Sequence, residues 1–433
     1  MLNTIKKIEY DLYLVLLGVL AFLSYTGLIT SLLLPLYVVI ALVLILKKKS
    51  VLYILPVALY LQLGFVELRG NVRVTTIYTV IFILLAGFDA IKNRRITKLG
   101  DLFIPLSILT GLSIITGINA PSLFSWFAGF TQMFSALLLY FYFVNTTEND
   151  KDNFIKISKM FLYLGVFVTL EMFHFIYKSD NEIIYIIQRR IIDLGWENIN
   201  VVIYNNILGI PFVGYLIVKS KIKLPYMILA LVSVLGIFLT LSRSSILTVG
   251  VLALLVAPLM LYYEKDKKSL FIQGAVFGLI IVSIGFIIEQ NDLVTGYMDS
   301  LLGRDLLHFK DRWVLLVTAW EKLLEFPLFG SGGLYTSREF LNGPLNYHNT
   351  IAQVSTLGFT GIIAFIYLFF KKTKLILSKN HEIKWYLLIM IYVTAFVNGS
   401  LQPMYFYVSH LVVIFMILAV YENTDEAFNK EEK

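Results

Sequence analysis

Residues 201–263 read VVIYNNILGIPFVGYLIVKSKIKLPYMILALVSVLGIFLTLSRSSILTVGVLALLVAPLMLYY. Three apolar runs, at 201–218, 224–241 and 244–263, are separated only by a lysine-rich joint and a Ser-Arg turn. A helix needs roughly 20 mostly apolar residues to cross a bilayer. The stretch therefore predicts three consecutive transmembrane helices.

The composition of the whole chain agrees with this prediction. Of its 433 residues, 58% are apolar and 15% are charged, whereas a soluble domain has about 45–50% apolar and about 25% charged residues. These values exclude a soluble enzyme of this size, a disordered chain, collagen and a coiled coil. The chain has no cysteine, which excludes disulfides, cysteine-ligated zinc, iron–sulfur clusters and a thiol nucleophile.

Similar apolar runs recur along the chain. We predict an all-α polytopic membrane protein that forms a single transmembrane domain over residues 1–433, with about 12–14 transmembrane helices. The candidate spans are 12–29, 31–46, 51–67, 74–91, 101–118, 122–144, 155–177, 201–218, 224–241, 244–263, 270–288, 347–370, 384–400 and 404–421.

The basic residues predict the orientation. With both termini in the cytoplasm, 25 of the 36 lysines and arginines lie on the cytoplasmic side of the membrane, as the positive-inside rule requires. We therefore predict a multi-pass protein of the cytoplasmic (inner) membrane.

The type of basic residue also differs between the two sides. The outer side carries only three lysines but eight of the ten arginines: Arg69, Arg73, Arg189, Arg190, Arg243, Arg304, Arg312 and Arg338. The guanidinium group offers a planar fork that suits phosphate oxygens. The bias indicates an anionic ligand on the outer side; the alternative is pairing with outer carboxylates such as Glu197 and Asp305.

Two outer connections are long, at 178–200 and 289–346. Long ordered loops in compact proteins are usually functional. We predict that the 289–346 loop bears part of the active site.

The Ser-Arg turn is Leu241-Ser242-Arg243-Ser244-Ser245. We expect Ser244 to cap the following helix. Arg243 is either a phosphate ligand beside a helix N-terminus or an interface residue that snorkels to lipid headgroups.

The long loop contains a predicted helix in the membrane interface. Its residues at helical spacing form one apolar face with two tryptophans, and the helix should end at Phe326-Pro327. Arg304 and Arg312 precede or begin this helix and could meet a lipid-borne head group. The face consists of Trp313, Leu316, Val317, Trp320, Leu323 and Leu324.

A glycine stretch, 330–333, leads to His348 and Asn349 at the start of the twelfth candidate span. The glycines permit a tight backbone and close approach of a ligand. Histidine is suited to proton transfer near neutral pH, so His348 is the candidate base; for this histidine a capping or interface role is the alternative. Asn349 is a candidate substrate contact. His308 is a weaker candidate base.

Polar residues also stand at the start of the span that follows the 178–200 loop. Asn200 there would suit either sugar hydroxyls or a helix cap, and Arg189 and Arg190 in the loop are further candidate substrate contacts. Glu171 is an acid within a predicted span, a feature that raises the hypothesis of transport.

In order along the chain, Ser-Arg (242–243), Gly-Arg (303–304), Arg-Trp (312–313), Gly-x-Gly (330–332) and His-Asn (348–349) form a set. The set resembles the O-antigen ligase and Wzy-type polysaccharide polymerase superfamily. The resemblance is strongest over about 240–365, with weaker support from 194–215.

The resemblance implies a helical bundle of the GT-C type and an inverting glycosyltransferase that uses no metal and no cofactor. It implies that Arg243, Arg312 and Arg304 bind the diphosphate of an undecaprenyl-diphosphate-linked glycan, and that His348 activates the acceptor hydroxyl. Two features depart from the family pattern. Ser244 follows the arginine where a small residue such as glycine is usual, and fourteen spans exceed the twelve common in ligases, which favours a polymerase or fewer spans than we place.

We therefore predict a glycosyltransferase that polymerises lipid-linked repeat units of a surface polysaccharide (capsule, exopolysaccharide or O-antigen). The alternatives are an O-antigen ligase that transfers the glycan to lipid A core, and a transporter or flippase of lipid-linked sugars. Expected partners are the glycan donor, a glycan or lipid A core acceptor, the lipid bilayer and a chain-length regulator. No nucleic acid is expected.

Overall fold

The structure, a computed structural model, describes residues 2–47, 50–64, 72–93, 97–120, 123–179, 192, 194, 199–240, 242–289, 310–332, 349–379, 381–401 and 408–424. Within these residues the regular structure is entirely helical, as the sequence predicts. The chain divides into two compact units, residues 1–93 with 152–306 and residues 94–151 with 307–433, and each is described by itself.

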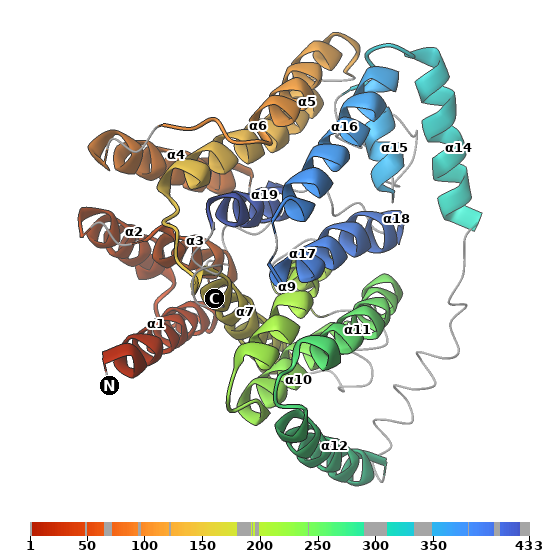
Figure 1. Cartoon of the computed structure of the whole chain (residues 1–433). Helices are drawn as coiled ribbons and strands as arrows, with labels where there is room; N and C mark the ends of the chain where they lie inside the picture. The colour runs from red at the N-terminus through yellow and green to blue at the C-terminus, as the bar shows by residue number, and fades with distance from the viewer. Residues whose placement is uncertain are drawn as a thin grey trace. The chain divides into compact units, whose positions relative to one another are not determined.

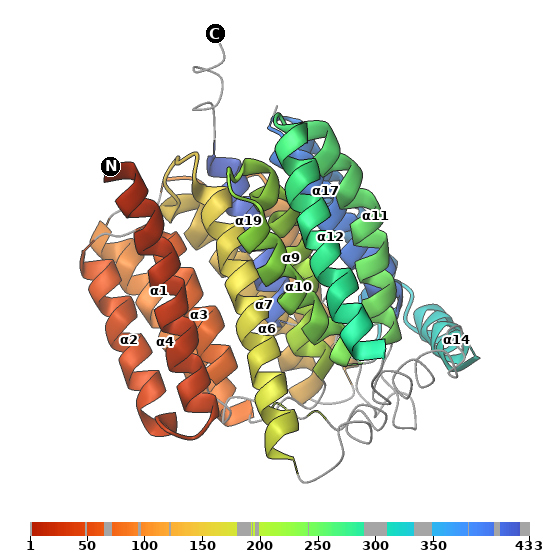
Figure 2. The same ribbon diagram turned by 90° about the horizontal axis from the view of Figure 1, so that it is seen from below.

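The first unit is a bundle of long helices. Figure 2 shows α9, α10, α11 and α12 running alongside one another. The helices are α1 (Leu2–Tyr25), α2 (Thr30–Leu46), α3 (Val51–Gly64), α4 (Val72–Asn93), α7 (Asn153–Lys178), α9 (Ile199–Lys219), α10 (Leu224–Leu239), α11 (Arg243–Tyr263) and α12 (Lys267–Glu289).

Helix α7 is central to this unit and packs against α1, α3, α9 and α10. Small residues allow this close packing: a β-carbon at Gly209 would lie 2.8 Å from the Phe161 side chain. The Thr169 hydroxyl donates to the Val232 carbonyl across the α7–α10 contact at 3.0 Å. Small residues and interhelical hydroxyl bonds are how helices pack where lipid removes the hydrophobic drive for association.

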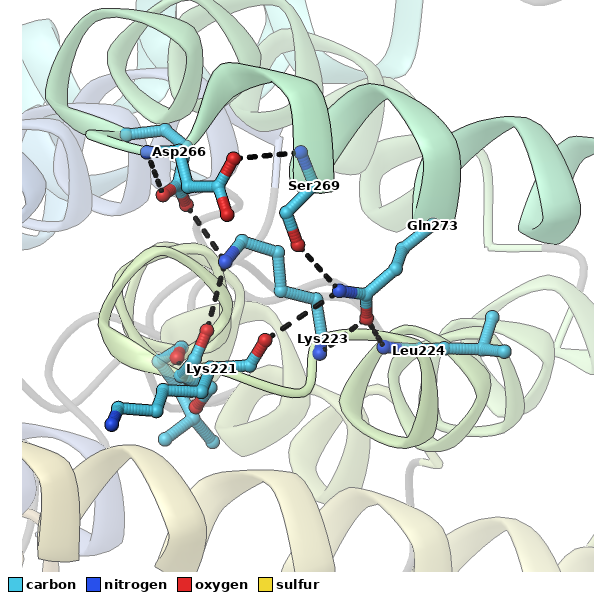
Figure 3. A network of polar contacts seen from close by, with 9 residues as sticks. Lys221, Lys223, Leu224, Asp266, Ser269 and Gln273 are labelled. Carbon is cyan, nitrogen blue, oxygen red and sulfur yellow. Dashed lines mark hydrogen bonds and ion pairs between the residues drawn. The ribbon is translucent and has the colours of Figure 1, made fainter.

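A buried polar network joins two turns at one end of this unit (Figure 3). Lys223, before α10, forms an ion pair with Glu264, after α11, at 3.1 Å, and both side chains are almost fully buried. Gln273 of α12 accepts hydrogen bonds from the backbone amides of Lys223 and Leu224 at 2.6 and 2.8 Å. The network fixes the α9–α10 turn against the α11–α12 turn.

The second unit carries the remaining helices, and Figure 1 shows α14 lying beside α15. They are α5 (Phe103–Ile115), η2 (Thr116–Asn119), α6 (Leu123–Thr146), α14 (Lys310–Glu325), α15 (Thr350–Ser355), α16 (Gly358–Leu377), α17 (Ile383–Tyr392), the π-helix η3 (Val393–Asn398), α18 (Gly399–Leu401) and α19 (Val408–Asn423).

Helix α19 packs against α6, and α16 against α5 and α17. The end of α19 is held by side chains: Lys379 Nζ donates to the Tyr421 carbonyl at 3.0 Å, and the Tyr140 hydroxyl donates to the Glu422 carboxylate. The Lys379 bond satisfies a backbone carbonyl that a helix end leaves without a partner, and the Tyr140 bond holds the side chain of Glu422.

Two predicted spans differ from the structure. The prediction of a single continuous helix at 347–370 is wrong. The helix is interrupted between α15 and α16, where Gly358 has φ +74°. The span predicted at 384–400 is helical but contains the six-residue π-helix Val393–Asn398.

Within the described residues, two helices are long and apolar enough to cross a membrane by length and composition, Asn153–Lys178 and Ser244–Tyr263. Shorter apolar helices include Leu224–Leu239 and Ile383–Asn398. Large apolar side chains such as Leu254 and Phe271 are exposed. The number of spans and the GT-C arrangement stay predictions.

Candidate functional site

The predicted site residues fall into three groups in the structure. Arg304, His348, Arg189 and Arg190 lie outside the described residues. The backbones of Arg243, Arg312 and Asn200 are described within helices, but their side chains are not. Asn349 is described in full. The site is therefore built here from the helices that carry these positions.

Arg243 is the first residue of α11. The residue that caps the helix is Ser242, with φ −76° and ψ 103°, so the prediction that Ser244 is the cap is wrong by two residues. Ser242 lies outside the helix because its backbone is extended, whereas Ser244 already belongs to the first helical turn.

Buried hydroxyl groups surround this turn. Ser242 Oγ lies 3.1 Å from Ser244 Oγ and accepts a hydrogen bond from Ser245 Oγ at 2.9 Å. Thr240 Oγ1 accepts from the Ser242 amide at 3.2 Å. The hydroxyls bond to each other, and Ser242 makes no side-chain cap to the helix. The amides at the start of this 21-residue helix therefore keep the partial positive charge that favours an anion.

Asn200 lies at the same end of the first unit. Short turns join α9 to α10 and α10 to α11, so α9 and α11 run in the same direction, and the two helices pack together. Asn200 is the second residue of α9 and Arg243 the first of α11. The structure thus brings these two predicted positions to one end of neighbouring helices.

Helix α9 also carries a buried amide among the polar residues at the start of this span. Asn206 is 3% exposed, and within the part of the chain that the structure describes neither its Oδ1 nor its Nδ2 has a hydrogen-bond partner. A β-carbon at Gly165 of α7 would lie 3.4 Å from Asn206 Cγ. A buried amide without a bond costs about 1–3 kcal/mol, so position 206 is a polar point inside the bundle below the Asn200 end of α9.

Arg312 and Asn349 come together in the second unit. Leu315 and Ala319 of α14 pack on Ala352 of α15. Beyond the C-terminal ends of these helices, the amide of Phe359 donates to the Pro327 carbonyl at 2.8 Å. The two helices are therefore parallel, with their N-terminal ends on the same side.

Both predicted positions stand near the N-terminal end of this pair. Ala352 packs against both Leu315 and Ala319, and position 312 and Asn349 each precede these contacts along their chains. Position 312 is in the first turn of α14 and Asn349 is the N-cap of α15. His348 immediately precedes Asn349 in the sequence, outside the described residues.

Asn349 is the N-cap of α15. Its Oδ1 accepts hydrogen bonds from the amides of Ile351 at 2.7 Å and Ala352 at 3.3 Å. The structure thus shows Asn349 as a helix cap. The candidate substrate contact stays a prediction.

The glycine stretch forms the tight backbone that the sequence predicts. Gly330 has φ +72° and a β-carbon there would overlap the Thr356 carbonyl oxygen. The amide of Ser331 donates to that oxygen at 2.9 Å, and Asn119 Nδ2 donates to the Gly330 carbonyl at 2.9 Å. The backbone that approaches Gly330 closely is therefore that of the turn between α15 and α16.

A second support for α15 comes from the residue after the π-helix. Thr350 Oγ1 donates to the Gly399 carbonyl at 3.3 Å, and a β-carbon at Gly399 would collide with that threonine. π-Helices are rare and often lie at functional sites. No periodicity in the sequence marks this π-helix.

Glu171, the acid that raised the transport hypothesis, is completely buried in α7. Its place inside the first unit differs from those of Asn200, Arg243 and Asn349, each of which stands at a helix end.

Most of these motifs lie within a region that matches a known family. Residues 228–369 match the family model described as O-antigen ligase. The matched region contains Arg243, Arg304, Arg312, His348 and Asn349. It confirms the predicted resemblance to the O-antigen ligase and polymerase superfamily.

The O-antigen ligase match covers about a third of the chain. It supports glycan transfer of the ligase or polymerase type and, together with the helical content, an integral membrane protein. None of the curated proteins matches the chain, and no solved structure matches it. Among the described residues, no three His, Asp or Glu side chains come together in a way that could hold a metal ion.

Proposed function

We propose that this protein is an inverting, metal-independent glycosyltransferase. It polymerises undecaprenyl-diphosphate-linked oligosaccharide repeat units of a surface polysaccharide on the outer face of the cytoplasmic membrane. The observation that carries the proposal is the O-antigen ligase match over 228–369, which includes the Ser-Arg turn and the His-Asn pair.

In the proposed reaction, His348 takes the proton of the acceptor hydroxyl while that oxygen attacks the anomeric carbon of the donor. The bond between the anomeric carbon and the diphosphate oxygen breaks, and the undecaprenyl diphosphate leaves with both bonding electrons. Arg243, Arg312 and Arg304 stabilise the negative charge that develops on the leaving group. Attack from the face opposite the leaving group inverts the anomeric configuration.

The helix ends support this division of roles. Arg243 is the first residue of α11, whose N-cap Ser242 makes no side-chain cap, and position 312 and Asn349 stand near the N-terminal end of the α14–α15 pair. Asn200, Asn349, Arg189 and Arg190 are proposed as further contacts to the glycan. The 289–346 loop would exclude water, so that the donor is not hydrolysed.

The test uses the purified protein in lipid nanodiscs with a lipid-diphosphate oligosaccharide and a chelator. We expect longer glycans and release of the carrier diphosphate. Arg243→Ala, Arg312→Ala and His348→Ala should each reduce lengthening by at least a hundredfold without changing the thermal unfolding midpoint. Lys322→Ala, which removes a charge from α14 away from its first turn, is the matched control and should keep full activity.

The outcomes separate the alternatives. Full activity of His348→Ala would refute the role of the base, and loss of activity in His308→Ala instead would transfer that role. Activity that requires an added lipid A core acceptor would identify a ligase.

The complete burial of Glu171 keeps a transporter of lipid-linked sugars as the second candidate. A transporter requires flipping of the labelled lipid across proteoliposomes. Flipping should be lost in Glu171→Gln and retained in His348→Ala. If the protein is a glycosyltransferase, we expect no flipping, and glycan lengthening should be lost in His348→Ala and retained in Glu171→Gln.

A further inference from the structure

Helix α14 has two apolar faces rather than the single face that the sequence predicts. Leu315, Ala319 and Leu323 are buried, and the first two pack on Ala352. Trp313 and Trp320, in contrast, are 67% and 56% exposed. A period of 3.6 residues cannot separate these faces, because both are apolar and they adjoin each other on the helix.

Four of the exposed apolar side chains form one narrow stripe, whereas Val314, which is 60% exposed, lies beside it. Trp313, Val317, Trp320 and Leu324 recur at spacings of four, three and four residues, which place them on one line along a helix. All four are exposed. The second unit thus presents a stripe with a tryptophan at its start and another near its middle.

A polar face lies next to this stripe. Glu321 and Glu325 are exposed, and Lys322 pairs with Glu325 at 2.6 Å. At about 100° per residue these positions lie roughly a quarter-turn from the tryptophan stripe and away from α15. Helix α14 therefore has three sides: one packed on α15, one exposed and apolar, and one exposed and mainly charged.

Exposed apolar side chains also occur in the turn after α14 and along α16. In the turn that follows α14, Leu328 is 63% exposed and Thr360 Oγ1 donates to its carbonyl at 2.6 Å. Along α16, Ile363, Ile366 and Phe370 are also largely exposed. The stripe on α14 thus continues the apolar outer surface of a helix in an integral membrane protein.

We infer that α14 docks onto the lipid bilayer as an interfacial helix, with its tryptophan stripe in the headgroup region. Its 16 residues span about 24 Å, too short to cross a bilayer, and its ends are charged. Tryptophan favours the membrane–water interface, and helices with one apolar and one charged face lie in that plane. This docking would also hold position 312 at the depth of a lipid-borne diphosphate, a consequence that rests on the proposed function.

The absence of native cysteine allows a direct test. Single cysteines at Val317 and Leu324 on the stripe, and at the adjacent Glu321 and Glu325 on the polar face, carry a nitroxide label. The full chain is placed in nanodiscs of phosphatidylcholine and phosphatidylglycerol. We expect the first pair to collide at least threefold more with oxygen, which concentrates in lipid, than with a water-soluble nickel complex, and the second pair to show the reverse preference.

Three results would overturn docking on lipid. Equal exposure of all four labels to the nickel complex would place the stripe in water. Dipolar broadening at 317 and 324 would indicate a second copy of the chain on this face. Immobile labels shielded from both reagents would indicate another segment of the same chain. No glycan is supplied, so each result is independent of glycosyltransferase activity.

Discussion

Two glycines, Gly330 and Gly358, hold the joint between α14 and α16. Both have positive φ, at +72° and +74°. A β-carbon at Gly358 would lie 2.5 Å from the Leu328 carbonyl oxygen. The atoms that would be struck belong to the backbone, which cannot move aside as a flexible side chain can.

Alanine at either position should therefore be costly. We expect Gly330→Ala and Gly358→Ala each to lower the free energy of unfolding by more than the roughly 1–2 kcal/mol of an unfavourable left-handed residue, because the overlap adds to it. Gly111→Ala is the control: it lies within α5 with no atom near its β-carbon, and should be neutral or stabilising. Unfolding followed by circular dichroism in detergent measures all three, and equal midpoints would contradict the importance of the joint.

Asn349 allows capping to be separated from substrate binding. Asn349→Ala removes the acceptor for two amides and should destabilise the protein by about 1 kcal/mol. Asn349→Asp preserves the acceptor and should restore the unfolding midpoint. If Asn349→Asp is as unstable as Asn349→Ala, the cap is not what the residue contributes; a stable but inactive Asn349→Asp would assign its amide to the glycan.

At the scale of elements, the ion pair between Lys223 and Glu264 links the α9–α10 turn to the α11–α12 turn of the first unit. Both side chains are almost fully buried, and Lys223 Nζ also donates to the Ser220 carbonyl at 2.8 Å. Removing one partner of such a pair leaves a buried charge without compensation. The bond from the Asp266 amide to Glu264 Oε1 can survive a change of Glu264 to its amide.

We therefore expect Glu264→Gln to destabilise the protein by about 3–5 kcal/mol. The double variant Lys223→Met with Glu264→Gln should recover most of this loss, because it removes the stranded charge. Glu325→Gln breaks the more exposed Lys322–Glu325 pair and should cost less than about 1 kcal/mol. Similar unfolding free energies for Glu264→Gln and Glu325→Gln would show that burial of the first pair carries no energetic weight.

The elements also show what the sequence could predict. Helix α14 ends at Glu325 directly before Phe326-Pro327, as predicted, because proline restricts the residue before it and cannot continue the helix. The break at 356–358 was missed, because Leu357, Phe359 and their neighbours continue the apolar run through it. Gly358 was the available signal, since glycine after a short helix commonly ends it.

At the candidate site, the motifs marked helix ends but not the contacts that support them. Arg243 begins a helix and Asn349 caps one, as short polar motifs beside apolar runs can indicate. The contacts that hold them come from distant residues: Asn119 binds the Gly330 carbonyl and Thr350 binds that of Gly399. Such pairs depend on tertiary packing and leave no spacing in one sequence.

At the scale of the whole molecule, the basic residues predict which side of the membrane each turn faces. Lys265 lies in the α11–α12 turn and Lys267 and Lys268 begin α12, whereas the turn after α14, residues 326–332, has no lysine or arginine. Lysine-rich loops remain in the cytoplasm. The first turn is therefore expected inside and the second outside.

Two single cysteines test this orientation in intact cells, because the natural chain contains none. Lys265 is exposed and so is Leu328, so both substitutions should leave the packing unchanged. We expect a membrane-impermeant maleimide to label Leu328→Cys in intact cells and Lys265→Cys only after the membrane is permeabilised, while the natural chain stays unlabelled. The reverse order would place the 326–332 turn in the cytoplasm. It would then separate the α14–α15 end from donors on the outer face and remove the topological basis of the proposed polymerisation, whatever the arginines and His348 do locally.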